Sequence, residues 1–197
     1  LAENTLIIFT SDNGGEIPTN KPQAPEIQAQ EEGLQINGDL RGDKHTIWEG
    51  GTRVPFVVSW PGRVKAGSVS HDMINIVDVF ATICDITDGT PPDTEGVAPD
   101  SFSFLPSLRQ SRRPTQRTSM VTADARGMHA IRKGDWKYID NSTPQAWSQG
   151  IEGAFKNAAP ELYNLADDPS ESRNLIKQEP EIAGKLANEL NRIRNAG

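Results

Sequence analysis

The sequence predicts an α/β protein in which part of a mixed sheet with flanking helices is followed by a small antiparallel sheet packed with a helix. Three observations carry this prediction. The first third of the chain holds two apolar runs, a helical repeat of apolar residues follows them, and the part from residue 119 onward holds short strand-like runs between turn signals. Uniformly apolar runs are typical of strands buried on both faces, whereas short runs between turns are typical of antiparallel sheets.

The two apolar runs cover residues 5–10 and 54–60. The first shows no alternation of polar and apolar side chains, so we expect a strand with helices on both sides of its sheet. Pro55 suits only the first positions of the second strand. The polar stretch 16–39 predicts a long loop, and loops of this length are usually functional or mobile. Because the first strand needs neighbours, we expect further strands of its sheet before Leu1.

A helix and a domain boundary are predicted next. Apolar side chains within residues 73–86 recur at helical spacing, and the helix should end near Asp88. Residues 90–116 are rich in Pro, Ser and Arg and predict a connecting loop. We therefore expect residues 1–115 to be part of a larger α/β domain and residues 116–197 to form a small C-terminal α+β subdomain.

The part of the chain from residue 119 onward predicts an antiparallel meander and a final helix. Gly127 and Lys133-Gly134-Asp135 provide turn signals between the strand-like runs. The runs are residues 119–123, 128–132, 136–139 and 161–165. After Pro180, apolar residues recur at intervals typical of an amphipathic helix, which we expect to pack on the inner face of the meander. The stripe consists of Ile182, Leu186, Leu190 and Ile193.

Composition narrows the classes of function. Of the 197 residues, 35% are hydrophobic and 24% are charged, which is typical of a globular rather than a disordered protein. The formal net charge of −7 disfavours nucleic acid as a partner, although a few local cations can still bind a small anion. No run approaches the roughly 18 apolar residues of a membrane span. The one cysteine, Cys84, excludes an intrachain disulfide.

A candidate metal site directly follows the first strand, where Asp12 and Asn13 stand. Ligands of open α/β sheets bind at the carboxyl ends of strands. A carboxylate and an amide oxygen suit a hard cation such as calcium, with magnesium as the alternative. Calcium takes about six to eight oxygens, so other ligands must come from elsewhere. The competing interpretation is an ordinary turn, because Asn-Gly is a strong hairpin signal.

A candidate anion site lies in the glycine-flanked segment that contains Arg41, Lys44 and His45. Lys44 could hold an oxyanion as a point charge, and His45 could act as a general acid or contact the substrate. The competing interpretation is a solvated loop lysine beside Asp43. Further along, the paired glycines after Glu49 predict a tight bend, and we interpret Glu49 and Arg53 first as structural residues that brace it.

Taken together, these segments resemble the C-terminal half of type I sulfatases, the formylglycine-dependent, arylsulfatase-like members of the alkaline phosphatase superfamily. The resemblance rests on the order of the segments as well as on their residues, and it covers nearly the whole chain. The segments are Thr-Ser-Asp-Asn-Gly (10–14), Leu-Arg-Gly-Asp-Lys (40–44), Trp-Glu-Gly-Gly-Thr-Arg-Val-Pro (48–55), Trp-Pro-Gly (60–62), residues 76–83, residues 131–138 and residues 161–169. The resemblance implies an alkaline-phosphatase-like fold, with residues 1–115 as the C-terminal part of the catalytic domain.

The resemblance also implies roles for the candidate residues in a sulfuric ester hydrolase. Asp12 and Asn13 would be two of the calcium ligands. Lys44 would be catalytic and substrate-binding, because it would contact the sulfate group and stabilise charge that develops on its oxygens. His45 would shape the substrate pocket. The substrate would be an aryl sulfate or a sulfated carbohydrate, and the metal would act as Lewis acid and template.

The nucleophile of this family is a formylglycine made from the Cys or Ser of a Cys/Ser-x-Pro-x-Arg motif. Cys84 is followed by Asp-Ile-Thr-Asp and does not fit. We expect no such motif in this chain, so a missing N-terminal segment would be the partner that supplies the nucleophile and the remaining metal ligands. We therefore expect the 197 residues alone to be inactive. By family resemblance, the whole protein would be periplasmic or secreted.

Two other functions stay open at this stage. One is a phosphoester or phosphonate hydrolase of the same superfamily, which would share the metal-site aspartate and the fold. The other is a non-catalytic remnant or binding module. The nucleophile segment discriminates a sulfatase from the phosphorus-ester hydrolase, because a formylglycine motif favours sulfate and an unmodified Ser or Thr favours phosphate. An upstream region that lacks the nucleophile or the paired aspartates would support the non-catalytic alternative.

Overall fold

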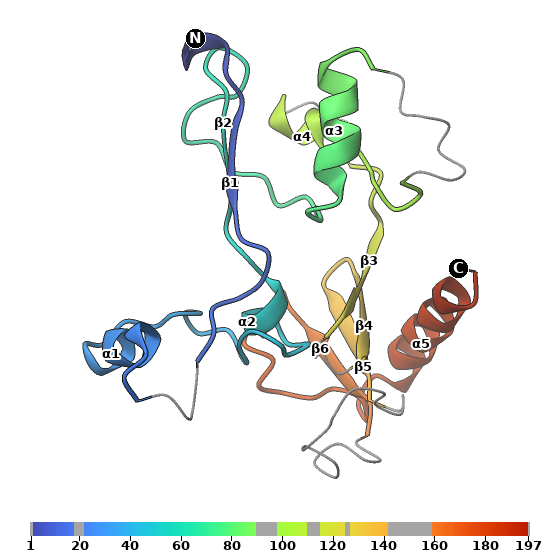
Figure 1. Cartoon of the computed structure of the whole chain (residues 1–197). Helices are drawn as coiled ribbons and strands as arrows, with labels where there is room; N and C mark the ends of the chain where they lie inside the picture. Colours follow the sequence, from blue (N-terminus) through green and yellow to red (C-terminus); the bar gives the residue numbers. More distant parts are fainter. Residues whose placement is uncertain are drawn as a thin grey trace. The chain divides into compact units, whose positions relative to one another are not determined.

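The computed structural model has a mixed α/β architecture with two antiparallel sheets (Figure 1). It describes residues 2–17, 22–89, 98–109, 115–124, 127–141 and 159–196. Two compact units can be separated: a first unit of Leu1–Thr10 with Pro55–Met120, and a second unit of Ser11–Val54 with Val121–Gly197. These units group residues in space and do not test the boundary between residues 115 and 116, which stays a prediction.

The sheet of the first unit consists of β1 (Ile7–Thr10) and β2 (Phe56–Ser59), which pair antiparallel with Ile7 opposite Ser59. We expected β1 to be buried on both faces, and within this chain that expectation is wrong. Ile7 and Phe9 are 58% and 64% exposed, and Val57 on the neighbouring strand is 58% exposed. The physical reason is that β2 is the only strand paired with β1 among the described residues, so one apolar face stays uncovered.

The predicted helix begins later than its apolar spacing suggested. A 3-10 turn, η1 (Ala2–Asn4), precedes β1, and α3 (Asp78–Ile86) and α4 (Leu105–Leu108) follow β2. The Asp78 carboxylate accepts a hydrogen bond from Asn75 N (2.7 Å), while Asn75 Oδ1 accepts one from Val77 N (3.2 Å). This arrangement resembles a capping box, which satisfies the free amides at a helix start, and residues 73–77 stay outside α3. The predicted connecting loop 90–116 lies partly outside the described residues.

The second unit contains the predicted meander. Its strands are β3 (Ser119–Ala123), β4 (His129–Lys133), β5 (Trp136–Asp140) and β6 (Glu161–Asn164), arranged in that order. β4 pairs antiparallel with β5 across a turn in which Gly134 has a φ of 57°, and β5 pairs antiparallel with β6. These strands confirm the runs predicted from the sequence to within a residue at each end.

The two faces of this meander pack against different segments. One face, with Ile131, Tyr138 and Leu162, packs on α5 (Pro180–Arg194), which confirms the predicted helix and its inward stripe. The other face packs on the segment that contains the candidate anion site. Its hydrophobic cluster consists of Ile47, Met128, Ala130, Ile139, Tyr163 and Leu165, with Trp48 against it. The alternation of side chains along a strand explains how neighbouring residues serve both cores.

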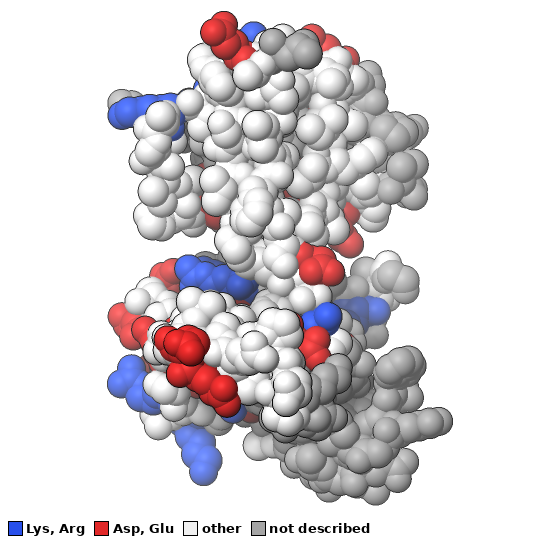
Figure 2. Space-filling model, turned by 60° about the vertical axis from the view of Figure 1, so that its left-hand side comes forward, with Lys and Arg blue, Asp and Glu red and all other residues white. Residues whose placement is uncertain are grey.

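Three short helices of the described residues lie in segments that we predicted to be irregular, and one of them is α4, within the predicted loop 90–116. α1 (Pro25–Glu31) lies within the predicted loop 16–39 and begins at a proline, as helices often do. α2 (Glu49–Thr52) replaces the predicted bend. Among the described residues, no helix is both long and apolar enough to cross a membrane. Figure 2 shows lysine and arginine side chains in separate groups between acidic ones on the visible face.

Candidate functional site

The turn after β1 carries the two predicted metal ligands, and both lie in the second unit. Asp12 is exposed, and its carboxylate has no hydrogen bond or ion pair among the described residues. Asn13 Nδ2 donates to Gly14 O (2.8 Å), which leaves Asn13 Oδ1 available as a ligand. Gly14 N donates to Gly51 O (3.0 Å). The backbone of the turn is therefore fixed while two side-chain oxygens stay accessible.

Lys44 lies in a loop that is closed by Thr46, whose Oγ1 donates to Asp43 O (2.6 Å) and accepts from Asp43 N (3.0 Å). Lys44 Nζ lies 3.7 Å from Glu16 Oε2, and the two side chains are 36% and 41% exposed. Exposed ion pairs of this kind contribute at most about 1 kcal/mol. The ammonium can therefore leave Glu16 for a bound anion at little cost.

The structure brings the two predicted segments together. Lys44 N donates to Gly15 O (3.1 Å), which joins the Lys44 loop to the turn after Asp12 and Asn13. The side chain of Asn37 links the same segments: its Oδ1 accepts from Gly15 N (2.8 Å), and its Nδ2 donates to Gly15 O (3.0 Å). Sequence reasoning missed Asn37, because a polar residue in a long loop carries no signal of its partner.

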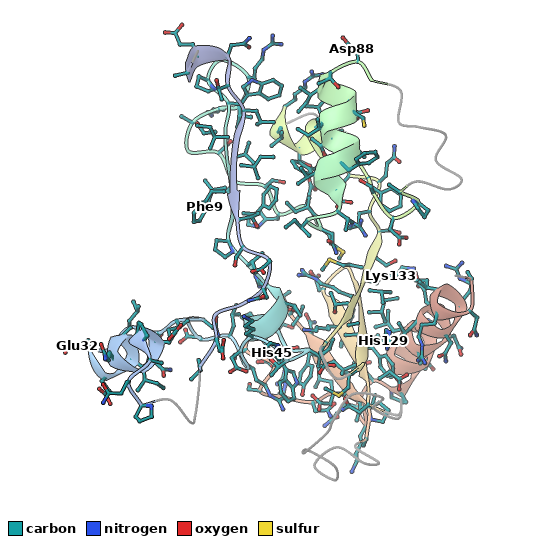
Figure 3. The ribbon with its side chains drawn as sticks, in the orientation of Figure 1. Phe9, Glu32, His45, Asp88, His129 and Lys133 are labelled. Carbon is teal, nitrogen blue, oxygen red and sulfur yellow. The ribbon has the colours of Figure 1, made fainter. Side chains whose placement is uncertain are left out.

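The three side chains of the predicted anion site, Arg41, Lys44 and His45, have different surroundings. His45 is exposed and has a φ of 76°, a backbone region that histidine enters more readily than most residues. Figure 3 shows it beside α2. Arg41 is engaged elsewhere, because its Nη1 donates to Tyr163 Oη (2.8 Å) and its guanidinium lies 4.0 Å from the ring centre of Trp48. Arg41 therefore has a structural role, and Lys44 and His45 are left as the candidate anion contacts.

A polar cluster around Glu161 holds the ring of Trp48 against the meander. Trp48 Nε1 donates to Glu161 Oε2 (3.1 Å), and Tyr163 Oη donates to the same oxygen (2.6 Å). Burial and this hydrogen bond to Glu161 raise the pKa of the Tyr163 hydroxyl above its ordinary value. The hydroxyl therefore stays a proton donor at any physiological pH.

Glu49 has the structural role that we expected, and its partners were not predicted. Glu49 Oε1 and Glu171 Oε1 both lie 2.9 Å from Lys137 Nζ, and Glu49 N donates to Glu171 Oε2 (2.6 Å). Burial raises the pKa of Glu171 against the opposing effect of Lys137. One feature of the sequence could have indicated this triad. Side chains alternate along a strand, so Lys137 lies on the same face as the buried Ile139, where a charged side chain needs a partner.

The turn that leads out of β6 depends on the charge of Asp168. This carboxylate is 9% exposed and accepts from Ser172 N (3.1 Å), Ser172 Oγ (2.9 Å) and Arg173 N (2.8 Å). Burial alone would raise its pKa, but these hydrogen bonds outweigh burial and lower the pKa from the ordinary value of 3.8. The stabilisation is therefore present above pH 3.8 and is lost as the pH falls through the lower, folded-state value.

We expect Asp168→Asn to lower the free energy of unfolding by about 1–2 kcal/mol at pH 7, because one carboxylate oxygen becomes an amide NH2 that cannot accept a hydrogen bond, and the bonds to the remaining, neutral oxygen are weaker. The difference from wild type should shrink as the pH falls below 3.8 and through the lower folded-state pKa, where wild-type Asp168 itself becomes protonated. Urea unfolding of both proteins at pH 7 and at acid pH measures this difference. A difference that stays constant with pH would contradict the assigned role of the charge.

One spacing match corrects the expectation about the nucleophile motif. Ser59-Trp60-Pro61-Gly62-Arg63 has the letters Ser-x-Pro-x-Arg, so such a motif does occur in this chain. Ser59 is the last, exposed residue of β2, and a turn closed by a hydrogen bond from Arg63 N to Trp60 O (3.0 Å) follows it. No ionisable side chain hydrogen-bonds to Ser59 among the described residues, so nothing there activates its hydroxyl.

The two candidate ligands fit calcium in chemistry but not in number. A carboxylate and an amide oxygen are the hard donors that calcium prefers, and the carboxylate of Asp12 has no competing partner among the described residues. Within the residues that the structure describes, no group of three or more His, Cys, Asp or Glu side chains could hold a metal. Asp12 and Asn13 can therefore contribute to a calcium site but cannot complete one.

Comparison with known proteins decides the family. The family model named Sulfatase matches residues 1–90. The N-acetylgalactosamine-6-O-sulfatase of Bacteroides thetaiotaomicron is 36% identical over 98% of this chain, and the human N-acetylgalactosamine-6-sulfatase is 31% identical over 87% of it. A solved structure of a 6S-sulf protein, described within the metabolism of multiple glycosaminoglycans by B. thetaiotaomicron, matches 98% of the chain with a TM-score of 0.82 and 33% identity.

The chain belongs to the sulfatase family. Its fold is accordingly the alkaline-phosphatase-like fold of these sulfatases, as the sequence predicted. This sulfatase chain spans about a third of the length of the curated relatives that it matches, 37% and 33% of the two named above. It also shares its fold with a phosphonate monoester hydrolase of Agrobacterium radiobacter, which is 21% identical with a TM-score of 0.58 and covers 97% of the chain.

Proposed function

We propose that this chain supplies part of the active site of an enzyme that hydrolyses sulfate esters. In this proposal Asp12 and Asn13 are calcium ligands, Lys44 contacts the sulfate and His45 lines the substrate pocket. The observation that supports it most is the hydrogen bond from Lys44 N to Gly15 O (3.1 Å), because it sets the anion-binding loop beside the turn with the two oxygen ligands. A sulfate held by both a cation and a lysine has its negative oxygens neutralised from two sides.

In this enzyme, calcium would supply Lewis acidity and hold the sulfate oxygens in place. Lys44 would neutralise charge on the oxygens as the S–O bond breaks, and the exposed histidine beside it would contact the alcohol part of the ester. The nucleophile, a formylglycine, would come from outside this chain. The names of the relatives make N-acetylgalactosamine 6-sulfate the first substrate to test, within the broader class of carbohydrate and aryl sulfates.

The test is an assay of the protein made from the complete reading frame that encodes this chain. We expect turnover of a carbohydrate 6-sulfate, loss of that turnover in chelator and its recovery with calcium. The 197 residues alone should be inactive. A phosphonate monoester assayed in parallel tests the alternative of a phosphorus-ester hydrolase, and faster turnover of that substrate would replace the sulfatase proposal. A reading frame without a second Cys/Ser-x-Pro-x-Arg motif, together with no turnover of either ester, would indicate a non-catalytic remnant.

A further inference from the structure

Both candidate segments are attached to one short helix, α2. Its Gly51 O accepts a hydrogen bond from Gly14 N (3.0 Å), and its Gly50 N donates to Arg41 O (2.7 Å). The packing is as close as backbones allow, because a Cβ on Gly50 would lie 2.3 Å from Gly42 O. A shift of α2 must therefore move the turn after Asn13 and the loop that leads to Lys44.

The position of α2 is in turn fixed by the three buried charges of Glu49, Lys137 and Glu171. The side chains of Glu49 and Lys137 are 6% and 3% exposed, and that of Glu171 is fully buried. Glu171 accepts from the first backbone amide of α2, Glu49 N (2.6 Å). Lys137 belongs to β5, and Glu171 follows β6. The meander thus holds the first turn of α2 at two points.

Lys137 and Glu171 cannot touch a substrate, because their side chains are buried. Stability alone is a weak reason for such a triad, since buried ion pairs can often be replaced by apolar residues without loss of stability. The charge-assisted hydrogen bond from Lys137 Nζ to Glu49 Oε1 (2.9 Å) does, however, fix direction as well as distance. It therefore sets the orientation of α2 in a way that an apolar contact would not.

We propose that Lys137 and Glu171 are positioning residues that set the geometry of the candidate calcium and sulfate site through α2. In this proposal the C-terminal meander helps to set the geometry of the site. The effect on turnover rests on the proposed function, whereas the effect on the geometry of α2 and its two attached segments does not. Groups that hydrogen-bond directly to metal ligands typically change metal affinity or activity 10–100-fold when removed, and we expect an effect of this order from the support of α2.

The first test is amide hydrogen exchange in the complete protein, with Lys137→Met and Glu171→Gln compared with wild type. We expect the amides of Gly14, Lys44 and Gly50 to exchange about tenfold faster in Lys137→Met, with a smaller change in the same direction in Glu171→Gln. Amides of α5, on the other face of the meander, should stay within about twofold. Glu171→Gln preserves side-chain shape and decides the question if Lys137→Met does not fold. Unchanged exchange at all three amides would overturn the proposal.

The second test separates positioning from stability by using a matched pair in the first unit. Arg117 Nη2 lies 2.6 Å from Asp78 Oδ1, with side chains 7% and 1% exposed. At a temperature where all variants are folded, Lys137→Met should lower kcat/KM about 10–100-fold and weaken calcium binding, while Arg117→Met should stay within about threefold of wild type. Equal effects of the two variants would overturn the positioning role. If wild type shows no turnover or calcium binding, the proposed function has failed, and the exchange experiment still decides the role of the triad.

Discussion

Lys44→Met should lower kcat/KM for a sulfate ester by about 100–1,000-fold in the complete protein, because one donor to the developing negative charge is lost. This corresponds to about 3–4 kcal/mol of transition-state stabilisation. The variant should fold normally. The backbone contact from Lys44 N to Gly15 O does not involve the side chain, and the ammonium meets only the exposed Glu16 at 3.7 Å among the described residues.

The matched control is Lys133→Met. Lys133 Nζ lies 2.6 Å from Glu189 Oε2, and its side chain is 49% exposed, so it forms a surface ion pair on a different face of the second unit. Removal of this pair should leave kcat/KM unchanged and change stability by less than about 1 kcal/mol. Steady-state kinetics of both variants measure the comparison. If Lys44→Met retains activity within threefold of the control, Lys44 does not contact the sulfate in the transition state.

The sequence was most informative where local patterns decide the structure. The strands at 119–123 and 136–140 and the stripe on α5 were readable because turn glycines and side-chain alternation act over a few residues. The same reasoning failed for the start of α3, where the hydrogen bonds from Asn75 N to Asp78 Oδ2 and from Val77 N to Asn75 Oδ1 set the first residue of the helix more strongly than the apolar repeat. Both kinds of feature are local in the sequence, but a capping hydrogen bond is harder to recognise from the sequence than a turn glycine or a repeat of apolar residues.

The supports of the candidate site were unreadable for a different reason. Glu49 meets Lys137 across 88 positions of the chain and Glu171 across 122, and no local pattern reports such pairings. The candidate ligands Asp12 and Asn13 and the candidate cation Lys44 could be proposed from the sequence, because Asp12-Asn13 follows a strand and Lys44 lies in a glycine-flanked segment. The residues that hold those segments in place become visible only after the chain has folded. The sequence thus predicts candidate site residues, and the structure adds the contacts that hold their segments in place.

Gly14→Ala should be the most damaging small substitution in the second unit. A Cβ at this position would lie 1.8 Å from Gly50 O and 2.8 Å from Gly50 C, and both atoms are backbone. Neither can move aside as a side chain would, so either the turn or α2 must shift, and the hydrogen bond from Gly14 N to Gly51 O is lost with it. We expect the free energy of unfolding to fall by about 2–4 kcal/mol, from overpacking and one lost hydrogen bond.

Gly184→Ala provides the opposite expectation for the same chemical change. Gly184 is an exposed residue within α5, and a Cβ there meets nothing within 4 Å. Alanine is the better helix former, so this variant should gain about 0.5–1 kcal/mol. Denaturant unfolding compares the two variants, and kinetics extend the comparison. A displacement of about 1 Å at the turn should also lower turnover by up to 100-fold in Gly14→Ala alone. If Gly14→Ala proves as stable and active as wild type, the turn with Asp12 and Asn13 cannot be packed against α2, and the geometry on which the proposed calcium and sulfate site rests must be abandoned.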